Sequence, residues 1–160
     1  MSSRRVVIAG ASGFIGRALV AELSAAGWSV TRLVRGPATR ADEVSWDPAS
    51  GTLDPAALSG ADSVINLSGA SISRIPWTRS VRGSIVASRR EATTTLVTAI
   101  NSAKSTPKVF LSGSAVGIYG GRGDEGLSET SARGTGFLAD VVEAWESNAS
   151  KARCRTVFLR

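Results

Sequence analysis

A glycine-rich turn near the N-terminus constrains the fold of this chain more than any other feature of its sequence. The short β-branched run at residues 6–9 leads directly into the sequence GASGFIG at residues 10–16. Apolar residues at helical spacing follow until Gly27, a typical helix-ending residue. A buried strand that passes through a tight turn into a helix starts a βαβ unit, and such units build parallel sheets with helices on both faces. The turn therefore predicts an α/β fold with a doubly wound parallel sheet.

The spacing of the glycines in this turn, GxxGxxG, indicates a site for a phosphate group. In such turns the first glycine allows the bend, the second lets the backbone approach a pyrophosphate, and the third lets helix and strand pack closely. The free N–H groups at the start of the helix then face the anion. We therefore expect a dinucleotide to be bound by Gly10, Ser12, Gly13, Phe14, Ile15 and Gly16. The alternative is a glycine-rich connection that binds nothing.

The end of the second strand, expected at residues 28–34, bears on which dinucleotide is bound. In NAD sites an acidic residue here holds the ribose 2′-hydroxyl, whereas in NADP sites a nearby arginine accommodates the 2′-phosphate. This chain has Arg32 and Arg35 there and no acidic residue before Asp42. Both arginines are able to pair with a phosphate through a planar guanidinium group. We expect NADP(H) as the cofactor, with NAD(H) less favoured; two solvated arginines at a sheet edge are the other interpretation.

The remaining sequence alternates between strand and helix patterns. Strands are expected at 44–46, 62–67, 109–111 and 156–159, helices at 78–103 and 137–152, and a short helical turn at 54–58. Residues 113–136 hold eight glycines and are expected to form one long loop, which in a compact domain is usually functional. We expect residues 1–160 to form one domain, and the chain's end directly after a strand indicates a part of a longer protein.

Composition removes several classes of active site. The chain has no histidine, which excludes Ser-His-Asp triads and histidine-ligated metals, and its single cysteine excludes internal disulfides and cysteine-ligated clusters. We therefore expect no metal site. The net charge of +6 favours an anionic ligand, so a nucleic-acid-binding protein is a further alternative. No apolar run approaches the roughly 20 residues of a membrane span, and we expect a soluble, cytoplasmic protein without membrane contact.

Three stretches of the sequence resemble the extended short-chain dehydrogenase/reductase superfamily. They are the GASGFIG turn, the expected strand at 62–67 that continues into Ser68 and Gly69, and the sequence SGSAVGIYG at 112–120. The resemblance implies a Rossmann-type domain with the strand order 3-2-1-4-5-6 and a cofactor at the carboxyl ends of the strands. It also adds residues to those expected near the cofactor, namely Leu67, Ser68, Gly69 and Ser88.

Four shorter segments are similar to one group within this superfamily, the NAD-dependent epimerase/dehydratase subfamily. It includes proteins described as nucleoside-diphosphate-sugar epimerases and as cell-division inhibitors. The segments are IPWT at 75–78, Ser88-Arg89, Gly136-Phe137-Leu138 and Trp145-Glu146. Members of this group are longer, and a C-terminal domain supplies most of their substrate pocket. The resemblance therefore implies an NADP(H)-binding Rossmann domain at 1–160 that lacks most of the substrate domain.

Active relatives in the superfamily use a serine or threonine, a tyrosine, and a lysine on the next helical turn that lowers the pKa of the phenol. Ser114 matches the serine, and Tyr119 is the only tyrosine of the chain. The residue four positions after Tyr119 is Gly123, and residues 137–142, where the pair is expected, contain neither tyrosine nor lysine. Ser114 and Tyr119 are the candidate catalytic residues, and the missing pair leaves open whether the chain is an enzyme. The resemblance does not place the catalytic tyrosine in the stretch that contains Tyr119, so an aromatic residue that packs and fixes the loop is the other interpretation of Tyr119, as an ordinary loop serine is of Ser114.

Three interpretations of the missing pair remain. Tyr119 acts as acid or base with an arginine as its partner, a carboxylate such as Asp124, Glu125 or Glu129 takes its place, or the domain binds NADP(H) without hydride transfer. The first two imply an epimerase or oxidoreductase acting on a small molecule, for which a nucleotide sugar is one candidate. The third implies a non-catalytic regulatory or scaffold protein. A basic block at 71–90 and an acidic block at 124–146 carry opposite charges, so one interpretation is that they face each other within the fold or across a homodimer. A solvated basic helix face is the other interpretation of the basic block.

Overall fold

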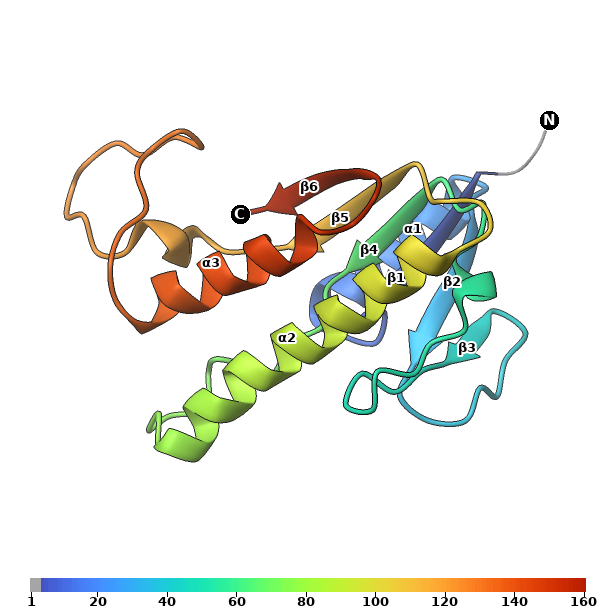
Figure 1. Ribbon diagram of the computed structural model, residues 1–160, viewed down its shortest axis with the longest axis horizontal. Coiled ribbons are helices and arrows are strands. Elements are labelled where there is room, and N and C mark those ends of the chain that lie inside the picture. Colours follow the sequence, from blue (N-terminus) through green and yellow to red (C-terminus); the bar gives the residue numbers. More distant parts are fainter. Residues whose placement is uncertain (1–3) are drawn as a thin grey trace.

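Six strands form one parallel sheet in the computed structural model, which describes residues 4–160 (Figure 1). The strands are β1 (Arg5–Ala9), β2 (Ser29–Val34), β3 (Glu43–Ser45), β4 (Ser63–Asn66), β5 (Val109–Gly113) and β6 (Arg155–Leu159). Their order across the sheet is β3-β2-β1-β4-β5-β6, and every neighbouring pair is parallel. The predicted strand order 3-2-1-4-5-6 is therefore confirmed.

Helices cover both faces of this sheet. The long helices are α1 (Phe14–Ala25), α2 (Arg79–Ser102) and α3 (Phe137–Ala149), and the short 3-10 helices are η1 (Pro55–Ala57) and η2 (Val116–Tyr119). Figure 1 shows α2 and α3 in front of the sheet and α1 behind it. Right-handed crossovers between parallel strands produce this doubly wound arrangement.

Alternation along the strands divides the apolar core into two parts. On β1, Val6 and Ile8 belong to the same buried cluster as Val20 of α1, whereas Val7 and Ala9 belong to the cluster on the opposite face, which includes residues of α2. All four β1 side chains are almost completely buried. Burial on both faces explains why the sequence of β1 is a continuous apolar run rather than an alternating one.

Two segments differ from the sequence-based expectation. Residues 113–136 are not one uninterrupted loop, because residues 116–119 form η2, whose Ile118 and Tyr119 are buried. Glycine-rich sequences carry no periodicity that would predict such a turn. The last strand, expected at 156–159, begins one residue earlier at Arg155, and because β6 lies at the sheet edge its side chains are partly buried or exposed.

Candidate functional site

A cavity of about 890 Å³ lies at the carboxyl ends of β1, β2 and β4. Parallel strands end at the same edge of a sheet, so the loops that follow them form a common wall. Many of the predicted cofactor residues line this cavity: Gly10, Ser12, Gly13, Arg35, Leu67, Ser68, Gly69 and Ser88. The other predicted residues, Phe14, Ile15, Gly16 and Arg32, are not among its lining residues.

The glycine turn packs closely against the loop that follows β4. Gly10 has a φ of +85°, and a Cβ at this position would lie 2.7 Å from the carbonyl carbon of Leu67. A Cβ at Gly16 would lie 2.2 Å from the carbonyl oxygen of Gly10. Neither contact is possible for a residue with a side chain, since such distances are far inside the van der Waals limit. The two glycines therefore bring the start of α1 against the ends of β1 and β4.

The N-terminus of α1 is uncapped at the cavity. Gly13 is the N-cap residue, no side chain caps the helix, and the first turn contains no acidic residue. Uncapped N–H groups and the helix dipole together favour an anion at this end. The side chains of Phe14 and Ile15 are 88% and 64% exposed. Because these side chains are apolar, the two residues contact such an anion only through their backbone N–H groups. The residues present fit a pyrophosphate group.

The two candidate arginines of the second strand have different surroundings. Arg35 lines the cavity together with Ser12. Successive side chains of a strand point to opposite faces of the sheet. Leu33 of β2 lines the cavity, so the side chain of its neighbour Arg32 projects from the opposite face. Its Nε lies 3.0 Å from Oδ2 of Asp42. Asp42 therefore pairs with Arg32, and Arg35 is the arginine that faces the cavity.

Ser88 and Arg89 of α2 hold the loop that follows β4. The Ser88 hydroxyl accepts a hydrogen bond from the N–H of Ala70 over 2.9 Å and donates one to the carbonyl of Ile85 over 3.2 Å. Nη1 of Arg89 donates to the carbonyls of Ala70 and Ile85, each over 3.1 Å. Burial lowers the pKa of the Arg89 guanidinium, which still carries its charge at neutral pH. The Ser88 hydroxyl thus fixes the backbone at Ala70, beside the cavity.

The cavity wall that follows β3 contains residues that the sequence pattern did not predict. Residues 46–49 form this wall. Four further unpredicted residues line other parts of the cavity: Ala70 and Ser71 of the loop that follows β4, and Glu91 and Ala92 of α2. The Asp47 carboxylate accepts hydrogen bonds from the Ser50 hydroxyl over 2.7 Å and from the N–H of Ala49 over 3.0 Å, and these lower its pKa. An available signal was the Asp-Pro turn directly after the expected strand at 44–46, because that position also lies at the carboxyl edge of the sheet.

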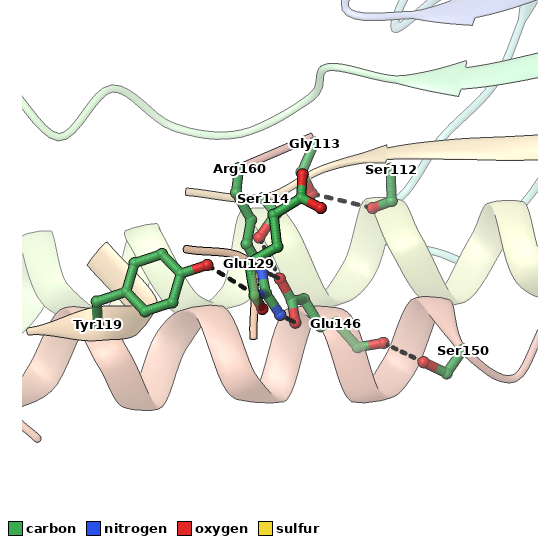
Figure 2. Close-up of polar contacts among 8 residues, drawn as sticks. All are labelled: Ser112, Gly113, Ser114, Tyr119, Glu129, Glu146, Ser150 and Arg160. Atoms are coloured by element: carbon green, nitrogen blue, oxygen red, sulfur yellow. Dashed lines mark hydrogen bonds and ion pairs between the residues drawn. The ribbon is translucent and has the colours of Figure 1, made fainter. Parts of the chain in front are cut away.

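A second polar cluster connects the two candidate catalytic residues (Figure 2). The Ser114 hydroxyl donates a hydrogen bond to Oε1 of Glu146 over 2.5 Å. Nε and Nη2 of Arg160 donate to the two carboxylate oxygens of Glu146, each over 2.8 Å. Nη1 of Arg160 donates to the Tyr119 hydroxyl over 3.0 Å and to the Glu129 carbonyl over 3.1 Å. Figure 2 shows Arg160 between Tyr119 and Glu146, so the connection between Ser114 and Tyr119 runs through two further side chains.

Opposing effects act on the carboxyl group of Glu146. Burial raises its pKa, while hydrogen bonds from Arg160 and Ser114, together with the charge of Arg160, lower it. The lowering effects prevail, so the Glu146 pKa lies below its ordinary value and the group is ionised at neutral pH. The hydrogen bonds to Glu146 and Tyr119 in turn raise the pKa of Arg160. Neither Glu146 nor Arg160 was a sequence-level candidate.

The acidic residues considered as substitutes for the missing tyrosine–lysine pair lie outside this cluster or reach it only through the backbone. Glu125 is held by Arg122, whose Nε and Nη2 each donate to its carboxylate over 2.7 Å. Glu129 contributes its carbonyl oxygen to the cluster, and Asp124 is exposed. None of these three carboxylates contacts Ser114 or Tyr119 in the part of the chain that the structure describes.

Other charged groups of the acidic block pair within the block. Arg133 forms ion pairs with Asp140 and Glu143.

Within residues 4–160, no group of three or more histidine, cysteine, aspartate or glutamate side chains is placed to hold a metal ion. No helix in the same range is long and apolar enough to cross a membrane.

A doubly wound parallel sheet in the order 3-2-1-4-5-6, with a glycine turn between β1 and α1, defines a Rossmann-type domain of the short-chain dehydrogenase/reductase class. The sequence agrees with this class, because the family model for the NAD dependent epimerase/dehydratase family matches residues 6–137. The chain belongs to that family.

Known proteins resemble the chain over its whole length. Epimerase family protein Mb2239 of Mycobacterium bovis is 39% identical over 163 residues, which cover 100% of this chain and 54% of the relative. The crystal structure of human epimerase family protein SDR39U1 (isoform2) with NADPH matches with a TM-score of 0.83 and 29% identity, over 98% of this chain and 52% of the human one. The nucleoside-diphosphate sugar epimerase from Corynebacterium glutamicum matches with a TM-score of 0.83 and 36% identity, over 99% of this chain and 34% of the other. The chain spans about half the length of the curated relatives it matches.

Proposed function

We propose that this domain binds a nicotinamide dinucleotide in the cavity and prefers NADP(H) to NAD(H). The observation that carries the proposal is the uncapped N-terminus of α1, which borders the same cavity as Arg35. The helix end offers N–H donors for a pyrophosphate, and the arginine offers a planar cation for a 2′-phosphate. The human relative whose structure contains NADPH supports this choice of cofactor.

Each part of the cavity has a role in this proposal. The backbone N–H groups of Phe14 and Ile15 hold the pyrophosphate, because the Gly13 N–H already donates to the Gly10 carbonyl over 3.0 Å. Gly10 and Gly16 allow the close packing that places them. The backbone of the β4 loop, fixed by the Ser88 hydroxyl, forms the wall opposite the glycine turn. Arg32, which is paired with Asp42 on the other face of the sheet, supports the strand rather than the cofactor.

We further propose that the protein of which this chain is a part is an epimerase or oxidoreductase acting on a small molecule, with a nucleotide sugar as the substrate class. The bound nicotinamide supplies the hydride acceptor or donor. Ser114 and Tyr119 supply hydroxyl groups that are able to bind the reacting oxygen and handle its proton. The family to which the chain belongs and the nucleoside-diphosphate sugar epimerase among its relatives support this proposal.

A non-catalytic NADP(H)-binding protein is the second candidate. The observation that favours it is the first half of α3, where residues 137–142 contain neither tyrosine nor lysine. Ser114→Ala and Tyr119→Phe in the full-length protein separate the two candidates. Loss of a measured turnover in both variants supports the enzyme, and an unchanged turnover in both supports the non-catalytic protein.

A fluorescence titration of the wild-type chain and of Arg35→Ala with NADPH and NADH tests the cofactor proposal. We expect NADPH to bind more tightly and to lose about 10- to 100-fold in affinity on substitution, because a hydrogen bond to a charged group contributes about 1.5–3 kcal/mol. Affinity for NADH should change by less than about threefold. Arg40→Ala is the matched control, because Arg40 is an exposed arginine that pairs with Asp42 and does not line the cavity. Absence of binding by a folded chain contradicts the proposal, and equal losses for the two dinucleotides contradict the role of Arg35.

A further inference from the structure

The hydrogen bonds among Ser114, Glu146, Arg160 and Tyr119 form one continuous chain across four separate segments. Ser114 follows β5, Tyr119 ends η2, Glu146 lies on α3, and Arg160 follows β6. The links are 2.5 Å between Ser114 and Glu146, 2.8 Å between Glu146 and Arg160, and 3.0 Å between Arg160 and Tyr119. The fold thus places two charged side chains between the two candidate catalytic hydroxyls.

The two charged groups determine which side chain donates and which accepts in each of these hydrogen bonds. A guanidinium only donates, so the Tyr119 oxygen accepts from Arg160 and the phenol proton points to another acceptor. An ionised carboxylate only accepts, so the Ser114 hydroxyl donates to Glu146 and its lone pairs remain for another donor. Toward a bound molecule, the Ser114 hydroxyl oxygen is therefore able to accept a hydrogen bond, and the Tyr119 hydroxyl is able to donate one. A secondary alcohol, which donates one hydrogen bond and accepts another, needs this combination.

We propose that Glu146 and Arg160 are positioning residues, which orient Ser114 as an acceptor and Tyr119 as a donor toward the hydroxyl group of a secondary alcohol. This inference rests on the proposed function and adds two positioning residues to it. It makes Arg160 the cationic partner of the tyrosine.

Glu146 acts through its neighbours and not as the base itself. Its two oxygens are both engaged by Arg160, and the hydrogen bonds from Arg160 and Ser114 outweigh burial in setting its pKa below the ordinary value. A carboxylate held in this way is a weak base at neutral pH. Its negative charge instead keeps the serine proton and the guanidinium in place.

The single tyrosine of the chain allows a direct test by NMR. With isotopically labelled tyrosine, Tyr119 gives the one Cζ signal, which reports on the hydrogen bond to its hydroxyl oxygen. Glu146→Gln keeps the shape of the side chain and removes its charge, so we expect the Tyr119 signal to shift at neutral pH although Glu146 does not touch Tyr119. Glu143→Gln is the matched control on the same helix, since Glu143 pairs with Arg133, and it should leave the signal in place.

A pH profile of the same signal distinguishes positioning from simple packing. The ionisable groups around Glu146 are Arg160, Tyr119 and Glu129, whose carbonyl oxygen accepts from Arg160. We expect the Tyr119 signal of the wild type to show a step on acidification, below the ordinary range of a glutamate, as Glu146 takes up a proton. Glu146→Gln should abolish the step. Ser114→Ala should move it to higher pH, because one of the hydrogen bonds that lower the Glu146 pKa is lost.

Several outcomes overturn the inference. A Tyr119 signal that is unchanged in Glu146→Gln, or a pH step that persists in that variant and disappears in Glu129→Gln, shows that Glu146 does not control the tyrosine. If Glu146→Gln does not fold, Ser114→Ala provides the test instead. An unmoved pH step in Ser114→Ala then overturns the inference. NADPH affinity is the independent readout, and we expect it to stay within about threefold in all these variants, because none of the altered residues lines the cavity. If the wild-type chain does not bind NADPH but its Tyr119 signal still shows the pH step, the result contradicts the proposed cofactor binding and leaves the positioning role of Glu146 and Arg160 standing.

Discussion

Nη1 of Arg160 lies 3.0 Å from the hydroxyl oxygen of Tyr119, and the guanidinium carbon lies 5.5 Å from the centroid of the tyrosine ring. The side chain that binds the phenol is therefore an arginine from the carboxyl end of β6, not a lysine from α3. A guanidinium stays protonated at neutral pH, so Arg160 donates a hydrogen bond to the tyrosine without taking part in proton transfer. Arg160 is therefore the arginine partner that the proposed role of Tyr119 requires.

Ser114 and Tyr119 should be required for turnover and dispensable for cofactor binding. In the full-length protein we expect Tyr119→Phe to lower kcat by about 100-fold or more, because general acid–base catalysis typically contributes about 10²–10⁴-fold. The NADPH dissociation constant should stay within about threefold, since neither residue lines the cavity. Steady-state kinetics and a parallel NADPH titration check this. A parallel loss of NADPH affinity and kcat would place Tyr119 in the cofactor site instead.

Gly16→Ala should destabilise the domain. The new Cβ would lie 2.2 Å from the Gly10 carbonyl oxygen, so α1 must move away from β1, at a cost of about 1–3 kcal/mol. Gly83→Ala is the matched control inside α2, where a Cβ has no neighbour within 4 Å. It should stabilise the domain by about 0.5–1 kcal/mol, because alanine favours a helix more than glycine does. Urea unfolding of both variants measures the difference, and equal effects would contradict the close packing at Gly16.

Ser88→Ala should weaken both dinucleotides by the same factor. The substitution leaves the N–H of Ala70 without its acceptor, so the β4 loop loses a contact that fixes the cavity wall. We expect about a 3- to 10-fold loss of affinity for NADPH and for NADH alike, in contrast to the selective effect of Arg35→Ala. Ser84→Ala, which removes an exposed hydroxyl one turn earlier on α2, should change neither affinity. A selective loss of NADPH affinity in Ser88→Ala would show direct contact with the 2′-phosphate.

The stability of the domain should depend on the ionisation of Glu146. Its pKa in the folded chain is lowered, so the ionised group stabilises the fold above the pKa of the unfolded chain, and this contribution is lost as pH falls through the lowered folded value. The difference in free energy of unfolding between wild type and Glu146→Gln should therefore be largest at neutral pH and shrink on acidification. Urea titrations between about pH 3 and pH 7 measure it. A difference that grows toward low pH would mean that burial dominates at this site.

The sequence predicts the sheet and one side of the cavity because both follow from local patterns. The run at β1 and the glycine turn are contiguous in the sequence, the arginine directly follows β2, and parallel strands bring them to one edge. The Asp42 partner of Arg32 could not be predicted, because the two residues meet only through the pairing of β2 with β3.

The cluster around Glu146 depends on contacts that no local pattern contains. Ser114 and Glu146 are 32 residues apart, and Tyr119 and Arg160 are 41 residues apart. They meet only because β5 and β6 are neighbours in the sheet and α3 packs beside η2. Such pairings need the packed tertiary structure, and a single sequence holds no signal for them.

A crystal structure of the chain with NADPH tests the central claim most directly. We expect the pyrophosphate at the N-terminus of α1, within hydrogen-bonding distance of the N–H groups of Phe14 and Ile15, and the 2′-phosphate in contact with Arg35. A dinucleotide bound away from the glycine turn, or a 2′-phosphate held by groups other than Arg35, would contradict it.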